Sequence, residues 1–220
     1  MASLVHDRDM SAASVARFAV VAATAGLASG YGTRALLCSS RVTVSRWRTY
    51  VLIAVGAASA GAVTWRFADR GWLYPAYLLL AVAAVPLTAV DVVEHRIPDA
   101  IVKPSFVLAV ALLGAEALHT HQAWPIVRAG MAAGAVYAAF LVLIISTEES
   151  MGWGDGKLLA FSALFLGYLG WERLLAGLLL TFAGAAIVAG GKALSGRRGA
   201  RLPLAPFLLL GTLTAIIARR

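Results

Sequence analysis

Apolar residues occur in long runs along the whole chain, and short polar segments separate these runs. A membrane-spanning helix needs about 20 mostly apolar residues. Six stretches contain no charged residue, and each approaches that length: 18–33, 49–65, 71–90, 129–147, 174–191 and 202–218. The pattern therefore predicts a chain of membrane-spanning helices.

With their flanking residues included, the runs predict about eight spans in an all-α, polytopic membrane protein that forms a single transmembrane domain over residues 1–220. The fourth span is the weakest because Lys103 falls near its start, and the sixth is short, so six or seven spans remain open. The expected spans are 14–34, 49–66, 72–90, 100–117, 124–146, 156–170, 172–191 and 202–218.

Composition supports a membrane protein and argues against several other classes. Hydrophobic residues make up 60% of the chain and charged residues 14%, whereas a soluble domain has roughly 25% charged residues. The net charge of +8 comes mostly from short loops between apolar runs, so we expect no nucleic-acid partner. Cys38 is the only cysteine, which excludes an internal disulfide and a thiolate zinc site. We expect no metal and no cofactor.

Basic residues predict the orientation in the membrane. The segment after the first span and the segment after the seventh are the most basic connections, and cytoplasmic loops are enriched in Lys and Arg. Two spans separate Asp91 from Asp155, so both aspartates lie on the same side, which this rule makes cytoplasmic. We therefore expect the protein in the inner (cytoplasmic) membrane, with both aspartates facing the cytoplasm.

Small residues are dense inside several spans. Gly and Ala recur at 56–61, 130–134 and 184–191. Small faces allow membrane helices to approach closely, so we expect helix contacts at these positions.

The two polar segments 91–99 and 152–158 are the main candidates for chemistry. Asp155 lies among Gly152, Gly154 and Gly156, directly before an apolar run. Glycine permits tight backbone conformations and close approach of another chain, such as an extended substrate. The structural alternative is that Asp155 only caps a helix.

Asp99 follows Pro98 and precedes an apolar run, so it also fits a helix cap. Asp91 ends an apolar run, where the helix dipole disfavours a negative charge. It is explained either by a structural ion pair with Arg96 or Lys103, or by catalysis. Two neighbouring carboxylates do not both ionise readily, so one can keep its proton while the other activates water.

Three segments resemble the type IV prepilin peptidase family of membrane aspartyl proteases. Segment 91–99 has the pattern Asp-Xaa6-Pro-Asp, and segment 152–158 reads Gly-Xaa-Gly-Asp-Xaa-Lys-Leu. Segment 201–208 is similar to the family's Pro-Phe-Gly-Pro-Phe-Leu motif, with Leu204 and Ala205 in place of Phe and Gly. The resemblance implies that Asp91 and Asp155 are the catalytic pair. It gives motif-supporting or substrate-binding roles to Pro98, Asp99, Gly152, Gly154 and Lys157.

The resemblance also implies the substrates, which are prepilin-like or pseudopilin proteins with a basic leader followed by a hydrophobic helix. Cleavage at the cytoplasmic membrane face agrees with the orientation expected from the loops. Glu94, Glu148 and Glu149 lie in the two polar regions, where they either attract the leader or are solvated loop charges.

One departure limits what carries over from the family. Long members have a cytoplasmic domain with paired CxxC motifs after the first span, a region associated with N-methylation. Here the corresponding connection, 35–48, is a short basic loop with Cys38 alone, so we expect a short form without methyltransferase activity.

Alternatives remain. A presenilin-like protease shares Gly-Xaa-Gly-Asp but pairs it with Tyr-Asp on the preceding span. A proton-coupled transporter also uses membrane carboxylates, but usually near the midplane. A structural membrane subunit is the third possibility, and the oligomeric state stays open.

Overall fold

The computed structural model describes residues 12–39, 46–94, 97–146, 152–195 and 203–218, with side chains for most of them. These residues form eight α-helices and no strands. The helices are α1 (Ala12–Ser39), α2 (Arg46–Phe67), α3 (Leu73–Glu94), α4 (Asp99–His119), α5 (Trp124–Ser146), α6 (Trp153–Leu169), α7 (Trp171–Leu194) and α8 (Ala205–Ile217).

The all-α architecture predicted from the apolar runs is confirmed. Five helices, α2 to α5 and α7, are long and apolar enough to cross a membrane. The fourth run, which Lys103 made the weakest expectation, forms the 21-residue helix α4. By contrast, α6 and α8 are shorter apolar helices of 17 and 13 residues. The chain is a multi-pass membrane protein.

Helices extend into both ends of segment 35–48, which we expected to be a basic loop. Helix α1 continues to Ser39 and α2 begins at Arg46, so only 40–45 separates them, and that segment lies outside the described residues. A long apolar helix extends past its hydrophobic run because each further residue adds a backbone hydrogen bond.

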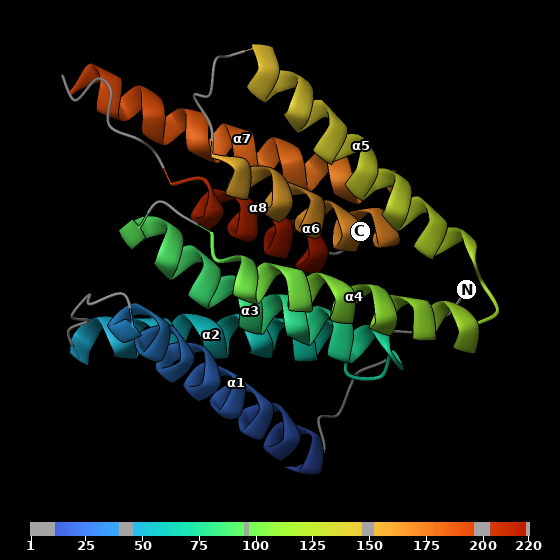
Figure 1. Ribbon diagram of the computed structural model, residues 1–220. Helices are drawn as coiled ribbons and strands as arrows, with labels where there is room; N and C mark the ends of the chain where they lie inside the picture. Colours follow the sequence, from blue (N-terminus) through green and yellow to red (C-terminus); the bar gives the residue numbers. More distant parts are fainter. Residues whose placement is uncertain (1–11, 40–45, 95–96, 147–151, 196–202, 219–220) are drawn as a thin grey trace, which may run out of the picture.

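Helix α6 lies inside the bundle, between α5 on one side and α4, α7 and α8 on the others (Figure 1). Its residues are buried almost without interruption from Gly156 to Tyr168. The hydrophobic core joins α6 to α3 and α8, and α1 and α2 pack on the far side of α3. A helix that is apolar all round is typical of such an interior position.

Aromatic residues fix α3 against α6. The Tyr77 ring stacks on Phe67 with centroids 4.3 Å apart and meets the edge of Phe165 at 5.3 Å. The Tyr77 hydroxyl donates a hydrogen bond to the Phe165 carbonyl oxygen at 2.8 Å. This hydroxyl is fully buried, so the bond removes the cost of an unpaired polar group in the core.

Arginines satisfy the carbonyl ends of two helices at the end of the bundle opposite the aspartates. Arg128 of α5 donates to the Gly167 and Tyr168 carbonyls of α6 at 2.7 and 2.5 Å. Arg173 of α7 donates to carbonyls at the end of α8, at 2.7 and 2.6 Å. The last carbonyls of a helix lack intrahelical donors, and a cation there also matches the helix dipole.

The expectation that small residues mark helix contacts is confirmed in part. Ala132 of α5 lies against Gly167 of α6, an added Cβ at Gly184 of α7 would lie 3.3 Å from Phe207 Cδ1 of α8, and small residues also join α1 and α2. A Cβ added at Gly56 would lie 2.9 Å from Ser29 Cβ, so these helices approach at the backbone. The expectation is wrong for Gly130, Gly134, Gly190 and Gly191, where an added Cβ would meet no atom of the described residues within 4 Å. Composition alone does not say which small faces are covered.

Candidate active site

Four helix ends meet at one end of the bundle. The C-terminal turn of α3 carries Asp91, and the first turn of α6 carries Asp155. The N-terminal turns of α4 and α8 begin close by (Figure 1). The two polar segments singled out in the sequence are thus brought together.

Asp91 is buried, with 4% of its surface exposed. Its Oδ2 accepts a hydrogen bond from the backbone N–H of Ala205, at 3.0 Å. Ala205 is the first residue of α8, where the backbone N–H groups have no intrahelical acceptor and the dipole is positive. The start of α8 therefore offsets the unfavourable position of Asp91 at the end of α3.

Sequence reasoning did not assign any residue of α8 to the site. It matched segment 201–208 to a family motif but gave that motif no role. The contact between Ala205 and Asp91 depends on where α8 packs. Its donor is a backbone N–H, which every residue except proline has, so the residue type of Ala205 does not indicate this contact.

Asp155 lies in the first turn of α6, before the apolar stretch that begins at Leu158. Burial, and secondly the negative charge of Asp91, raise the pKa of Asp155 from 3.8 to about 6. A hydrogen bond from the Gly152 backbone acts in the opposite direction. Helix α6 is capped by Gly152 rather than by Asp155, so the simple N-cap alternative for Asp155 is wrong.

The glycines around Asp155 are needed for contacts within this chain. A Cβ at Gly154 would lie 2.9 Å from Ile97 Cβ, and one at Gly156 would lie 2.3 Å from Phe140 Cδ1. Ile97 and Phe140 therefore occupy the space that we expected an extended substrate to use at these two positions. Gly152 is different, because the nearest atom to its added Cβ is Asp155 Oδ2 at 3.7 Å.

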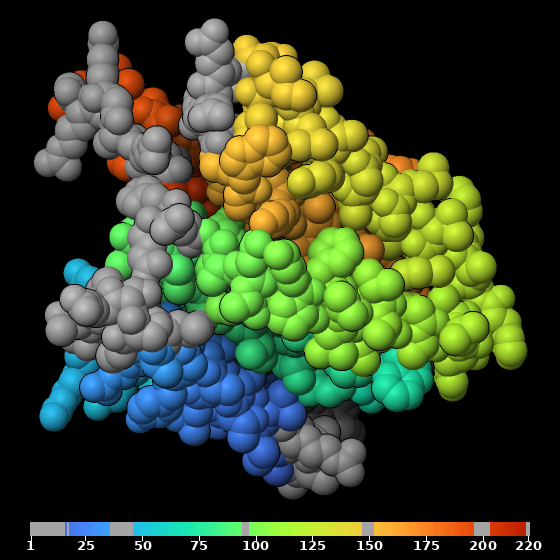
Figure 2. All heavy atoms as spheres, viewed as in Figure 1, coloured from blue at the N-terminus to red at the C-terminus, as the bar shows by residue number. Residues whose placement is uncertain are grey.

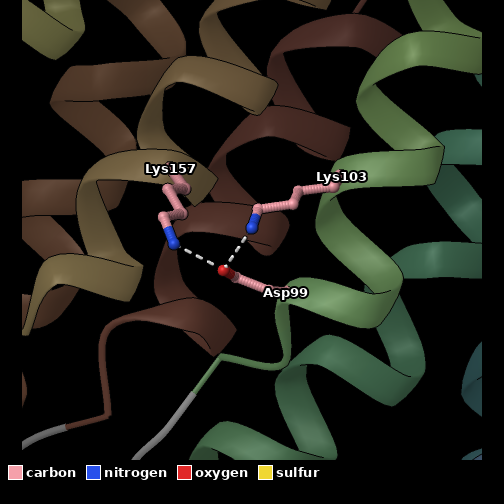
Figure 3. A network of polar contacts seen from close by, with 3 residues as sticks. All are labelled: Asp99, Lys103 and Lys157. Atoms are coloured by element: carbon pink, nitrogen blue, oxygen red, sulfur yellow. Dashed lines mark hydrogen bonds and ion pairs between the residues drawn. The ribbon is translucent and has the colours of Figure 1, made fainter.

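Asp99 does not cap α4, so that prediction is wrong. The cap residue is Pro98, and Asp99 is the first residue of the helix. Asp99 Oδ1 accepts a hydrogen bond from Lys157 Nζ of α6 at 2.5 Å, and Oδ2 pairs with Lys103 Nζ at 2.8 Å (Figure 3). Lys157 is thus directed at Asp99, and the ion pair joins the starts of α4 and α6.

Some predicted residues cannot be placed. Glu148 and Glu149 lie outside the described residues, and only the backbone of Glu94 is described. Within the described ranges, His, Cys, Asp and Glu form no cluster of three that would suit a metal ion.

The arrangement suits a shared proton. Asp155 holds a proton more strongly than an ordinary carboxyl, while Asp91 accepts a backbone N–H bond that favours a negative charge. Two titratable groups that differ in this way can act as acid and base in one reaction.

Comparison with known proteins identifies the family of the chain. Residues 76–190, which include both aspartates, match the model of the "Type IV leader peptidase family". The chain is 28% identical over 187 residues to the "Prepilin leader peptidase/N-methyltransferase" of Stutzerimonas stutzeri. That match covers 82% of this chain but only 62% of the relative, and no solved structure matches. Because the family model covers more than half of the sequence, the chain belongs to the type IV leader peptidase family.

Proposed function

We propose that this protein is a membrane aspartyl endopeptidase that removes leader peptides from prepilin-like or pseudopilin substrates. The observation that carries the proposal is the electrostatic pairing of the buried Asp91 with Asp155, whose pKa is raised to about 6. Membership of a leader peptidase family supports the same reaction.

In the proposed mechanism Asp91 is the base and Asp155 the acid. Water attacks the scissile carbonyl carbon and transfers a proton to Asp91, while Asp155 gives its proton to the carbonyl oxygen. Collapse of the tetrahedral intermediate breaks the C–N bond and returns that proton to Asp155. The proton on Asp91 passes to the leaving amine. The Ala205 N–H holds Asp91 in place through this cycle.

The proposed substrates have a basic leader followed by a hydrophobic helix, and cleavage occurs at the cytoplasmic face of the inner membrane. The two most basic connections, after the first and after the seventh span, fall on the same side as the aspartates and support this orientation. The relative from Stutzerimonas stutzeri is named as an N-methyltransferase as well. We propose peptidase activity alone, because Cys38 is the single cysteine and paired CxxC motifs are missing from the sequence.

The test uses purified protein in detergent, a prepilin with its leader, and mass spectrometry of the products. Asp91→Asn and Asp155→Asn should each abolish cleavage while leaving helicity unchanged. Asp99→Asn is the matched control, and it should keep partial activity because the ion pairs of Asp99 are partly exposed and solvent weakens them. Full activity in either of the first two variants would refute the mechanism.

The same assay tests methylation and metal dependence. With S-adenosylmethionine supplied, the mature product should keep the mass of an unmodified N-terminus, and a chelator should not change the cleavage rate. A methyl increment would refute the peptidase-only proposal, and inhibition by the chelator would refute the two-aspartate mechanism.

A further inference from the structure

An apolar slot opens between α4, α5 and α6, on the face where atoms of α6 are visible between the other two helices (Figure 2). Its volume is about 410 Å³. The residues that line it are Phe106, Val110, Ile126, Gly130, Ala133, Gly134, Tyr137, Ala160 and Leu164. Small residues form most of the α5 wall, and an added Cβ at Gly130 or Gly134 would meet nothing within 4 Å.

Two lysines lie on the same helix faces as the slot, one turn closer to the aspartate end. Lys103 precedes Phe106 by three residues on α4, and Lys157 precedes Ala160 by three residues on α6. Residues three or four apart in a helix lie above one another on one face. The ammonium groups therefore stand at the aspartate end of the slot.

Asp99 joins these lysines but neutralises only one of them (Figure 3). The three side chains carry a net charge of +1, and they remain 69%, 37% and 43% exposed for Lys103, Lys157 and Asp99. The slot thus combines an apolar wall with a positive group at the membrane edge.

We propose that this slot binds one anionic phospholipid, with an acyl chain against Gly130 and Gly134 and the phosphate at Lys103 and Lys157. Basic groups between membrane helices are suited to anionic headgroups at the cytoplasmic surface. The slot opens toward the side of α4 and α5, which the bilayer surrounds. This proposal does not depend on the reaction proposed above.

The geometry favours a lipid over a substrate helix. A helix with its side chains is 10–12 Å wide, so a single turn fills roughly 420–610 Å³, which already equals or exceeds the slot's volume of about 410 Å³. At 100° per residue, Ala160 and Leu164 lie about 140° and 180° around α6 from Asp155. A peptide in the slot would therefore face away from the aspartate pair.

The charge of the slot also argues against the substrate leader. A basic leader would be repelled by the net positive charge at Lys103, Asp99 and Lys157, whereas a phosphate is attracted to it. One lipid chain along Gly130 and Gly134 would cover a part of α5 where an added Cβ meets no described residue within 4 Å.

The test measures lipid retention by native mass spectrometry, with the full chain in mixed micelles that contain phosphatidylglycerol or phosphatidylcholine. The native protein should retain one phosphatidylglycerol and bind it more tightly than phosphatidylcholine. Lys103→Gln should weaken phosphatidylglycerol binding about fivefold, the change expected for one lysine at an anionic surface, and Lys103→Arg should restore it.

Filling the slot tests the acyl-chain site separately. Gly134→Leu should abolish retention of both lipids, because its side chain would occupy the slot. Gly190→Leu is the matched control, since Gly190 of α7 also has nothing within 4 Å and lies outside the slot. Circular dichroism confirms that both variants fold.

Three outcomes would overturn the proposal. The first is equal binding of the two lipids by the native protein. The second is retention of lipid by Gly134→Leu. The third is a result in which Gly134→Leu retains lipid as the native protein does but cleaves substrates with a hydrophobic helix more slowly. That result would assign the slot to the substrate.

Discussion

The raised pKa of Asp155 predicts how the cleavage rate changes with pH. The active form of the pair carries one proton, which we assign to Asp155. Burial and the charge of Asp91 raise the pKa of Asp155 to about 6, so the pair keeps this proton at pH values where an ordinary carboxyl has lost it. Cleavage should therefore decline above pH 6, and it should also decline at low pH when the pair takes up a second proton.

The size of the decline follows from that value. With a pKa of about 6, about nine tenths of Asp155 is protonated at pH 5, about one tenth at pH 7 and about one hundredth at pH 8. The rate should thus fall about tenfold for each pH unit above 6.5. Lys157 should not move this limb, because its ammonium group is directed at Asp99.

The assay measures kcat/KM from pH 4 to 9 with a prepilin whose own ionisable groups near the cut are removed. Circular dichroism at each pH separates loss of activity from unfolding. Lys157→Gln is the control variant, and its alkaline limb should coincide with that of the native protein. A rate that stays constant or rises from pH 6 to pH 8 would refute the assignment of the proton to Asp155.

Three further predictions test other parts of the structure. Asp155→Asn should raise the melting temperature at pH 7, because a carboxyl whose pKa is raised on folding destabilises the folded state above that pKa. Each kcal/mol of stability corresponds to about 2–4 °C in melting temperature. A lower melting temperature in this variant would contradict the prediction. Gly156→Ala should destabilise the protein by about 1–3 kcal/mol because the new methyl group would lie 2.3 Å from a Phe140 ring atom. Gly190→Ala, with nothing within 4 Å, is its control in thermal denaturation and should be neutral or stabilising. Cys38 should react with a membrane-impermeant thiol reagent only after cells are permeabilised, and labelling of intact cells would reverse the proposed orientation.

The sequence predicted the helices well because charged residues bound each apolar run, and this local pattern locates each helix to within a few residues of its ends. It also brought Asp91 and Asp155 to one face, since an even number of spans lies between them. Both arguments use only order along the chain.

The remaining features depend on partners distant in the sequence. Asp99 fitted a cap by its neighbours, but its Lys157 partner lies 58 residues away. The glycines of the second segment were expected to admit a substrate, but Gly154 and Gly156 instead lie against Ile97 and Phe140, which come from other elements. Which glycines pack against a helix and which line an open slot follows from helix placement, and composition does not record it.

The hydrogen bond between Ala205 and Asp91 has a consequence for the order in which the site is assembled during synthesis. The two residues are 114 positions apart, and the donor belongs to α8. At 5–20 residues per second, a ribosome needs roughly 6–23 s to proceed from one to the other. During that interval α3 is already made, but the N–H donor of Ala205 is not. Asp155 is also missing during the first part of the interval. A newborn chain therefore carries Asp91 without its hydrogen-bond donor until α8 has been made and has packed against α3.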